Sequence, residues 1–162
     1  SDGLGGKNPV ARVMPNTPAL VGKGASGYSL SSNVDEHHKR FIIDLLSAAG
    51  IATEVTEQLQ DAVTATSGSG PAYFFAFVES MIKGAIELGL SEEVATALVT
   101  QTLIGAAELL ETSGKSATTL RENVTSPNGT TFAALQSFSR DDLDSMVARA
   151  MKAARDRSIE LS

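Results

Sequence analysis

The 162-residue sequence contains no cysteine and no tryptophan, only two histidines, and 5% aromatic residues. Without cysteine, the chain has neither a disulfide framework nor a thiolate nucleophile. His37 and His38 are adjacent on a predicted helix and point to different faces. No carboxylate or third histidine lies at ligand spacing, so we predict no metal site. The scarcity of aromatics, beside frequent alanine, leucine and glutamate, favours a helical protein.

Basic residues are also in the minority, with 13 lysines and arginines against 19 aspartates and glutamates and a formal net charge of −6. This charge argues against nucleic acid or an anionic membrane as the main partner. We find no apolar run long enough to span a bilayer and no signal peptide at the start. The sequence therefore predicts a cytoplasmic protein, and its 42% apolar content is enough for a packed core.

The first third of the chain has a mixed α/β pattern. Strands are predicted at residues 11–14, 28–31 and 51–57, and a helix at residues 33–49. The segment GKGASG at residues 22–27 spells the dinucleotide fingerprint G-x-G-x-x-G. That fingerprint requires a helix to begin inside the motif, so that pyrophosphate meets the helix N-terminus. Because a strand follows here instead, we interpret the segment as a glycine-rich turn.

The rest of the chain has a helical pattern. The segment SGSGP at residues 67–71 has two interpretations: a break between helices, with Ser69 as a cap, or a point where the backbone approaches a ligand closely. The helix that follows is apolar nearly all round in its first half, so we infer that a partner subunit covers it. Helices are predicted at residues 59–66, 72–88, 91–111, 117–123, 130–138 and 141–161.

One loop, at residues 124–129, connects two of these helices and contains an Asn-Gly pair, which suits a backbone position with positive φ. The loop ends at a helix N-terminus, where unpaired N–H groups and the helix dipole favour an anion. Thr130 and Thr131 place hydroxyls at that point. From the residues alone, these threonines either cap the helix or contribute to a ligand site, and both interpretations stay open.

Four segments stand in the order and at the spacing of one enzyme family. They are RVMPNTP at residues 12–18, DAVT at 61–64, SGSGPAY at 67–73 and VTSPNGTT at 124–131. Together they resemble pyrroline-5-carboxylate reductase over nearly the whole chain. That family reduces the cyclic imine pyrroline-5-carboxylate to proline with NADPH or NADH, in the last step of proline synthesis.

The resemblance implies a fold in two parts. Residues 1–57 resemble the C-terminal remnant of a Rossmann cofactor domain. Residues 58–162 resemble a mainly α-helical dimerisation and substrate-binding domain, of the type found at the C-terminus of 6-phosphogluconate dehydrogenase. Since the first Rossmann strand and its glycine fingerprint are missing, we expect this chain alone to bind no cofactor tightly and to show no turnover. The family forms homodimers by interleaving helices, and often builds larger rings of dimers.

The resemblance also implies roles for six residues. Thr131 matches the catalytic threonine whose hydroxyl faces the imine nitrogen. Glu57 matches an acidic residue near the substrate, and Asn123 matches a residue near the nicotinamide of the cofactor. The residues that match the loop around the substrate carboxylate are Ser126, Gly129 and Thr130.

Three hypotheses follow for the function. The chain is part of a pyrroline-5-carboxylate reductase, or it is a dimerising helical module without turnover, or it belongs to a related small-acid dehydrogenase with the same two-part layout. The last should lack the SPNGTT loop at residues 126–131. Asn128 stands where the family usually has glycine, and because asparagine tolerates positive φ we expect the loop to keep its shape.

Overall fold

The computed structural model describes residues 8–161, which form two compact units. The first unit consists of residues 8–73 together with residues 149–161, and the second of residues 74–148. Helices α3 (Gly70–Glu87) and α7 (Leu143–Leu161) each contribute to both units. The first unit contains a small sheet and the second is all helical, so the expected helical chain with an α/β part before it is confirmed.

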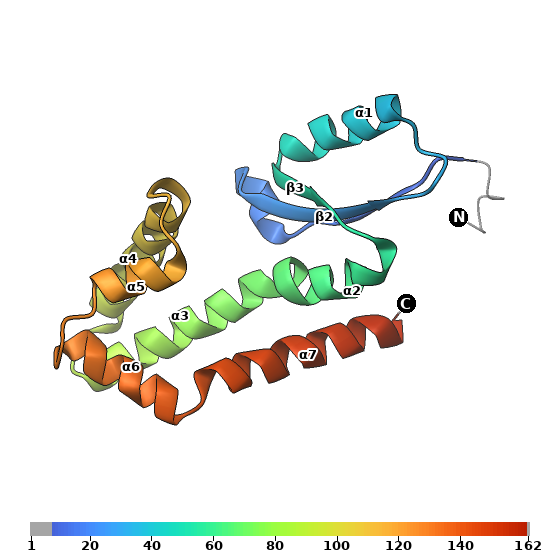
Figure 1. The fold of residues 1–162 in the computed structure, drawn as a ribbon. Helices are drawn as coiled ribbons and strands as arrows, with labels where there is room; N and C mark the ends of the chain where they lie inside the picture. Colours follow the sequence, from blue (N-terminus) through green and yellow to red (C-terminus); the bar gives the residue numbers. More distant parts are fainter. Residues whose placement is uncertain (1–7, 162) are drawn as a thin grey trace. The chain divides into compact units, whose positions relative to one another are not determined.

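The sheet has three strands in the order β1-β2-β3, with β1 (Ala11–Met14) antiparallel and β3 (Gly50–Glu54) parallel to the central β2 (Gly24–Leu30). Helix α1 (Glu36–Ser47) makes the crossover between the parallel strands and packs against β3. Figure 1 shows α1 and α2 (Gln60–Val63) on opposite sides of the sheet. This arrangement buries Tyr28 at the centre of β2.

Glycines let the backbone pack closely at the start of β2. We predicted a turn across residues 22–27, and this is wrong from Gly24 onward, where β2 begins. The N–H of Gly24 donates to the carbonyl of Ala49 at 2.8 Å, and a Cβ on Gly24 would lie 2.9 Å from the Cβ of Ala19. Gly50 lies against Gly24 with φ of 147°, a conformation that favours glycine. Strand pairing therefore occupies the place where a nucleotide fingerprint would need a helix.

The SGSGP segment continues the helix instead of breaking it. Helix α2 runs into a π-helical turn (η4, Thr64–Gly68), and α3 begins at Gly70. The N–H of Ser69 donates to the carbonyl of Thr64 at 2.8 Å, so this residue is held by the wide turn. The predicted break is wrong because the π-helical turn, with its extra residue, accommodates the glycines. Pro71 lies in the first turn of α3, where its missing N–H is not needed for a helical hydrogen bond. Such turns are frequent at functional sites.

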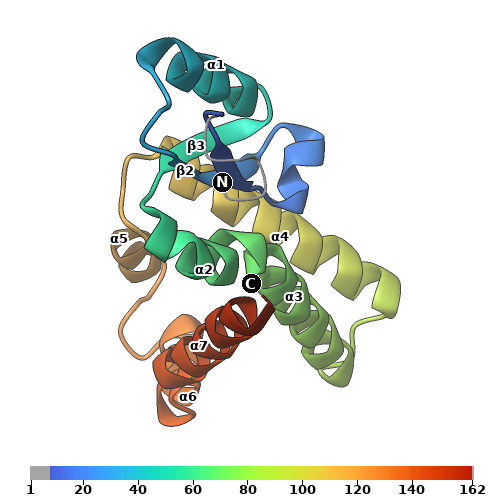
Figure 2. The same cartoon turned by 90° about the vertical axis from the view of Figure 1, so that its right-hand side faces the viewer.

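The helical unit follows the predicted pattern closely. It contains α4 (Glu92–Thr112), α5 (Ala117–Asn123) and α6 (Thr130–Arg140). The hydroxyl of Ser91 accepts from the N–H of Val94 at 3.3 Å, which confirms the predicted cap of α4. Gly89 has φ of 101° in the turn after α3. Figure 2 shows the extended connection from α5 to α6, which is the loop at residues 124–129.

Helices α3 and α4 leave most of their apolar side chains exposed. On α4 only Ala95 and Val99 are buried, although apolar residues recur from Val94 to Leu110. By length and composition α4 could also cross a membrane, so our prediction that no run is long enough is wrong on that count. Core helices of soluble proteins have the same composition. Large apolar side chains exposed on α3 and α4 include Phe74, Phe75, Phe77, Met81, Leu98, Ile104, Leu109 and Leu110.

The contact between β2 and α2 gives a test of this packing. A Cβ added to Gly27 would lie 2.5 Å from Cγ1 of Val63. We expect Gly27→Ala to lower the free energy of unfolding by about 1–3 kcal/mol through overpacking. Adding Val63→Ala should recover part of the loss, because it removes the two methyl groups that collide. Urea unfolding of both variants and of Val63→Ala alone measures this coupling, and strictly additive losses would contradict the contact.

Candidate active site

The loop at residues 124–129 has the conformation that its sequence predicted. Asn128 has φ of 58°, which confirms the positive φ expected at this position. The N–H of Gly129 donates to the carbonyl of Ser126 at 3.0 Å and closes the turn. The side chain of Ser126 lies directly over Gly129, and a Cβ at Gly129 would collide with its Oγ. A side chain at Gly129 would therefore displace the hydroxyl of Ser126 from its present position, although the φ of −81° at Gly129 is open to any residue.

Helix α6 begins without a side-chain cap. Gly129 is the N-cap residue, and Thr130 and Thr131 are the first two residues of the helix. The interpretation in which these threonines cap the helix is therefore wrong. Within residues 8–161, no group accepts a hydrogen bond from the N–H of Thr130, Thr131 or Phe132, and both threonine hydroxyls are unbonded. Thr131 is half-buried and Thr130 is exposed.

This helix end can bind an anion by two means. Its first N–H groups point out of the helix with no partner, and the helix dipole adds a partial positive charge at the same place. The hydroxyl of Thr131, partly sheltered from water, can donate to or accept from a group held there. The arrangement suits a small anion that carries a second polar group beside the charge.

Asn123 lies at the other end of the loop, as the exposed last residue of α5. A hollow of about 440 Å³ opens nearby, but none of the predicted site residues of this unit lines it. Its walls combine apolar and polar groups from α5, α6 and the start of α7. The lining residues include Arg121, Thr125, Phe132, Leu135 and Phe138.

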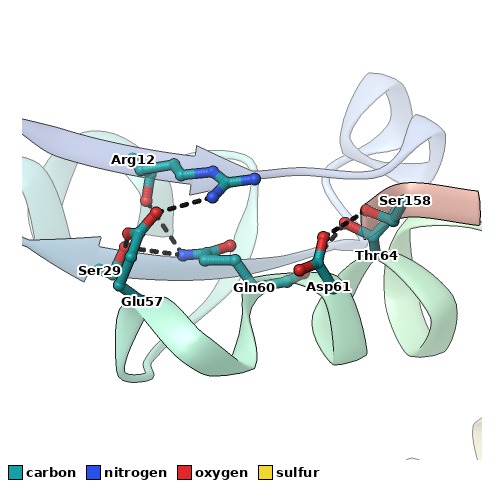
Figure 3. Close-up of polar contacts among 7 residues, drawn as sticks. All are labelled: Arg12, Ser29, Glu57, Gln60, Asp61, Thr64 and Ser158. Carbon is teal, nitrogen blue, oxygen red and sulfur yellow. Dashed lines mark hydrogen bonds and ion pairs between the residues drawn. The ribbon is translucent and has the colours of Figure 1, made fainter. Parts of the chain in front are cut away.

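Glu57 belongs to the first unit and is held by residues from two strands. Its Oε1 accepts from Nη1 of Arg12 on β1 at 2.7 Å, and its Oε2 accepts from the hydroxyl of Ser29 on β2 at 2.5 Å. Figure 3 shows both contacts, with the carboxylate between the two strands. The side chain of Glu57 nevertheless remains 58% exposed. The carboxylate is thus fixed through both oxygens and still reachable from solvent.

Gln60 lies beneath this carboxylate and is fully buried. Its Nε2 donates to the hydroxyl of Ser29 at 3.1 Å and to the carbonyl of Arg12 at 3.3 Å. The next residue, Asp61, accepts from the hydroxyl of Ser158 at 2.6 Å, which ties the end of α7 to α2 (Figure 3). The sequence analysis did not identify the partners of Glu57. Arg12 was part of a recognised segment, but the contacts of Ser29 and Gln60 have no local signal.

The electrostatics of Glu57 follow from these contacts. The hydrogen bond from Ser29, and then the hydrogen bond and charge of Arg12, lower the pKa of the Glu57 carboxyl, while partial burial works against them. Since both donors favour the ionised form, Glu57 is a carboxylate at neutral pH. Elsewhere in residues 8–161, no group of three histidine, aspartate or glutamate side chains is placed to hold a metal.

The six predicted site residues are thus divided between the units. Ser126, Gly129, Thr130 and Thr131 come together at one loop and one helix end, with Asn123 at the start of that loop. Glu57 belongs to the sheet-containing unit with a polar cluster of its own.

Comparison with known proteins places the chain beside one family. The family described as pyrroline-5-carboxylate reductase dimerisation matches residues 57–161. The pyrroline-5-carboxylate reductase of Pseudomonas aeruginosa is 47% identical over 98% of this chain, and that of Haemophilus influenzae 45% identical over 94%. These matches cover 59% and 57% of the two relatives, so the chain spans somewhat more than half of their length.

Solved structures agree with this placement. A pyrroline-5-carboxylate reductase from Coxiella burnetii superposes with a TM-score of 0.93 and 38% identity, covering 97% of this chain and 59% of that one. The Plasmodium falciparum pyrroline carboxylate reductase, solved with NADP bound, gives a TM-score of 0.87 and 37% identity. That match covers 94% of this chain and 62% of the Plasmodium chain.

The pKa of Glu57 can be measured directly. We expect an NMR pH titration to place it below the ordinary value for glutamate, and Ser29→Ala to raise it. Because the folded-state pKa is lowered, the stabilisation from Glu57 is complete above the ordinary glutamate pKa and is lost as pH falls through the lowered value. Lys39→Ala, which removes the 2.6 Å ion pair with Glu54, is the matched control and should leave Glu57 unchanged. If the pKa of Glu57 were the same in the Ser29→Ala protein as in the wild-type protein, the assignment of Ser29 as its donor would be contradicted.

Proposed function

The chain belongs to the pyrroline-5-carboxylate reductase dimerisation family, and from this we propose that it is the dimerising and substrate-binding part of an enzyme that reduces 1-pyrroline-5-carboxylate to L-proline with NADPH or NADH. The observation that carries the proposal is the uncapped N-terminus of α6, with Thr131 half-buried in its first turn. A substrate with one carboxylate and one ring nitrogen offers this helix end both partners that it lacks.

The roles of the loop residues follow from their chemistry. The free N–H groups at the start of α6, with Ser126, Gly129 and Thr130, hold the substrate carboxylate. Reduction adds a hydride to the imine carbon and requires a proton on the imine nitrogen. The hydroxyl of Thr131 meets that nitrogen and orients the proton there. From its match to the family, we also propose that Glu57 is an acidic residue near the substrate.

The cofactor supplies the hydride, and its pyrophosphate is held in this kind of domain by a glycine-rich turn that opens a helix. The only G-x-G-x-x-G segment in the sequence runs into strand β2 at Gly24, and no helix begins inside it. We therefore assign the cofactor phosphates to the portion of the relatives that this chain does not match. Asn123, exposed at the end of α5, is the one residue here that we assign to the nicotinamide.

We further propose that the protein acts as a homodimer in the cytoplasm, and that such dimers build larger rings. The exposed apolar side chains of α3 and α4 support a protein partner. The net charge of −6 disfavours nucleic acid or an anionic membrane as a partner.

Kinetics of two neighbouring variants test the assignment of Thr131. In the intact enzyme, we expect Thr131→Ala to lower kcat by about 10²-fold, at the low end for general acid–base help, because water substitutes in part for the hydroxyl. The KM for pyrroline-5-carboxylate should rise less, since the backbone N–H groups remain. Thr130→Ala, which removes the same groups one residue away, should cost less than about tenfold in kcat/KM. A Thr131→Ala enzyme with unchanged kcat would make the loop a binding element only.

Sedimentation tests the dimer. Burying a phenylalanine contributes about 1.5–3 kcal/mol, so we expect the 162-residue chain to be dimeric at micromolar concentration. Phe74→Glu and Leu98→Glu should each yield monomer or unfolded chain, because each places a charge on an exposed apolar face of α3 or α4. Leu20→Glu is the matched control: Leu20 is 90% exposed but lies outside the residues that match the dimerisation family. A folded wild-type monomer would contradict the proposal.

A further inference from the structure

One asparagine of the chain stands in a sequence context that makes it chemically unstable. Asn128 is the only asparagine in the sequence that glycine follows. Asparagine is among the thermolabile residues of proteins, because the backbone nitrogen of the next residue can attack its side-chain carbonyl carbon. Glycine has no Cβ, so it leaves the way to that nitrogen open. The sequence therefore favours loss of the side-chain amide at this position of the loop.

The side chain of Asn128 is accessible and unrestrained. It is exposed, and within residues 8–161 its amide has no hydrogen-bond partner. The matched residue is Asn123 at the end of α5, which is also exposed but is followed by valine. The branched side chain of valine crowds its own backbone nitrogen. Exposure is thus common to both asparagines, and of the two only Asn128 is followed by an unshielded nitrogen.

The folded loop opposes the reaction. Pro127 and Asn128 are the central residues of a turn, which the N–H of Gly129 closes by donating to the carbonyl of Ser126 at 3.0 Å. The attacking nitrogen has to give up this hydrogen, so the bond that closes the turn must break first. With its φ of 58° in this turn, Asn128 also holds the nitrogen of Gly129 turned away from its own Cβ, whereas ring closure requires the two to eclipse. Asn128 therefore reacts only when the turn opens.

The turn and the N-terminus of α6 share Gly129. This residue closes the turn and is also the N-cap of the helix, whose first N–H groups bind no acceptor within residues 8–161. An anion bound to those groups holds the start of the helix in place and with it the closed turn. A ligand of the closed state lowers the population of the open state, so it slows any reaction that needs the turn open.

We propose that Asn128 is a deamidation site that the closed loop protects, and that its modification weakens anion binding at the start of α6. The nitrogen of Gly129 loses its proton and forms a bond to Cγ of Asn128. The bond from Cγ to the side-chain nitrogen breaks, and ammonia leaves with that proton. Water then adds to either carbonyl of the resulting five-membered imide and opens the ring, which gives aspartate or isoaspartate. The net reaction exchanges ammonia for water and needs no oxidant or reductant.

The modification places a carboxylate beside a helix end that can bind an anion. Residue 128 directly precedes the N-cap, so its new charge interacts with the helix dipole and repels a second anion there. Isoaspartate also adds a carbon atom to the backbone and so disrupts the turn. This consequence rests on the proposed function, in which the anion is the substrate carboxylate. Deamidation then weakens substrate binding, and bound substrate or product protects the enzyme from deamidation.

Peptide mapping by mass spectrometry tests the modification. The intact enzyme is incubated at mildly alkaline pH, and we expect Asn128 to be converted while Asn123 stays intact. Urea-unfolded enzyme should convert Asn128 at least about tenfold faster than folded enzyme, because local opening limits the reaction in the fold. Equal rates in folded and unfolded enzyme, or conversion of Asn123 in preference to Asn128, would overturn the inference.

Ligand protection tests the link between the turn and α6. L-Proline at about ten times its Kd should slow the conversion of Asn128 in folded enzyme about tenfold, if only the closed loop binds it. Prolinamide at the same concentration is the control, since it lacks the carboxylate, and it should protect less. An unchanged rate with L-proline, or equal protection by both compounds, would sink the proposed link.

Two variants measure the effect of the new charge. Asn128→Asp introduces the carboxylate without altering the backbone, and we expect it to raise the KM for pyrroline-5-carboxylate about two- to fivefold at low salt, with kcat changed less than about twofold. High salt should reduce the difference. Asn128→Gly accepts the positive φ and has no amide to lose, so it is the control and should keep the wild-type KM. A wild-type KM in Asn128→Asp would contradict the proposed loss of anion binding.

The outcomes also distinguish this inference from the function on which part of it rests. If the wild-type enzyme does not reduce pyrroline-5-carboxylate, the proposed function fails, and peptide mapping still decides whether the closed loop protects Asn128. If the enzyme reduces it but Asn128 reacts equally fast in folded and unfolded enzyme, the function stands and the inference is wrong.

Discussion

A helical chain stays folded in water only if its apolar side chains find cover, and α3 and α4 leave most of theirs exposed. Phe74 and Phe75 on α3 are more than half exposed, and on α4 only Ala95 and Val99 are buried. Single exposed apolar residues are common on soluble proteins, but this many on two helices indicate a protein–protein interface. The match to a dimerisation family over residues 57–161 is consistent with such a contact.

The candidate site depends on this helical framework in an unusual way. Helix α6 has no side-chain cap, and the donors at its start are not used by the protein itself. Leaving a helix end unsatisfied is unfavourable unless water or a ligand takes the place of the cap. Gly129 makes this possible, because it brings the chain into the helix beneath Ser126 without adding an atom there.

The sheet-containing unit fixes a charged side chain, Glu57, at a partly exposed surface. Glu57 receives donors from two strands, and the buried amide of Gln60 orients one of these donors. These contacts hold the carboxylate in one orientation although 58% of the side chain is exposed.

The sequence alone determined the features that depend on near neighbours along the chain. The cap at Ser91, the positive φ at Asn128 and the four segments typical of the family are all local, so they could be recognised residue by residue. The tertiary structure decided the rest. Whether Gly24 began a turn or a strand depended on Ala49 and Gly50, and whether SGSGP broke a helix depended on a π-helical turn. The partners of Glu57 lie 28 and 45 residues away, and no local pattern indicates which distant strands will be paired.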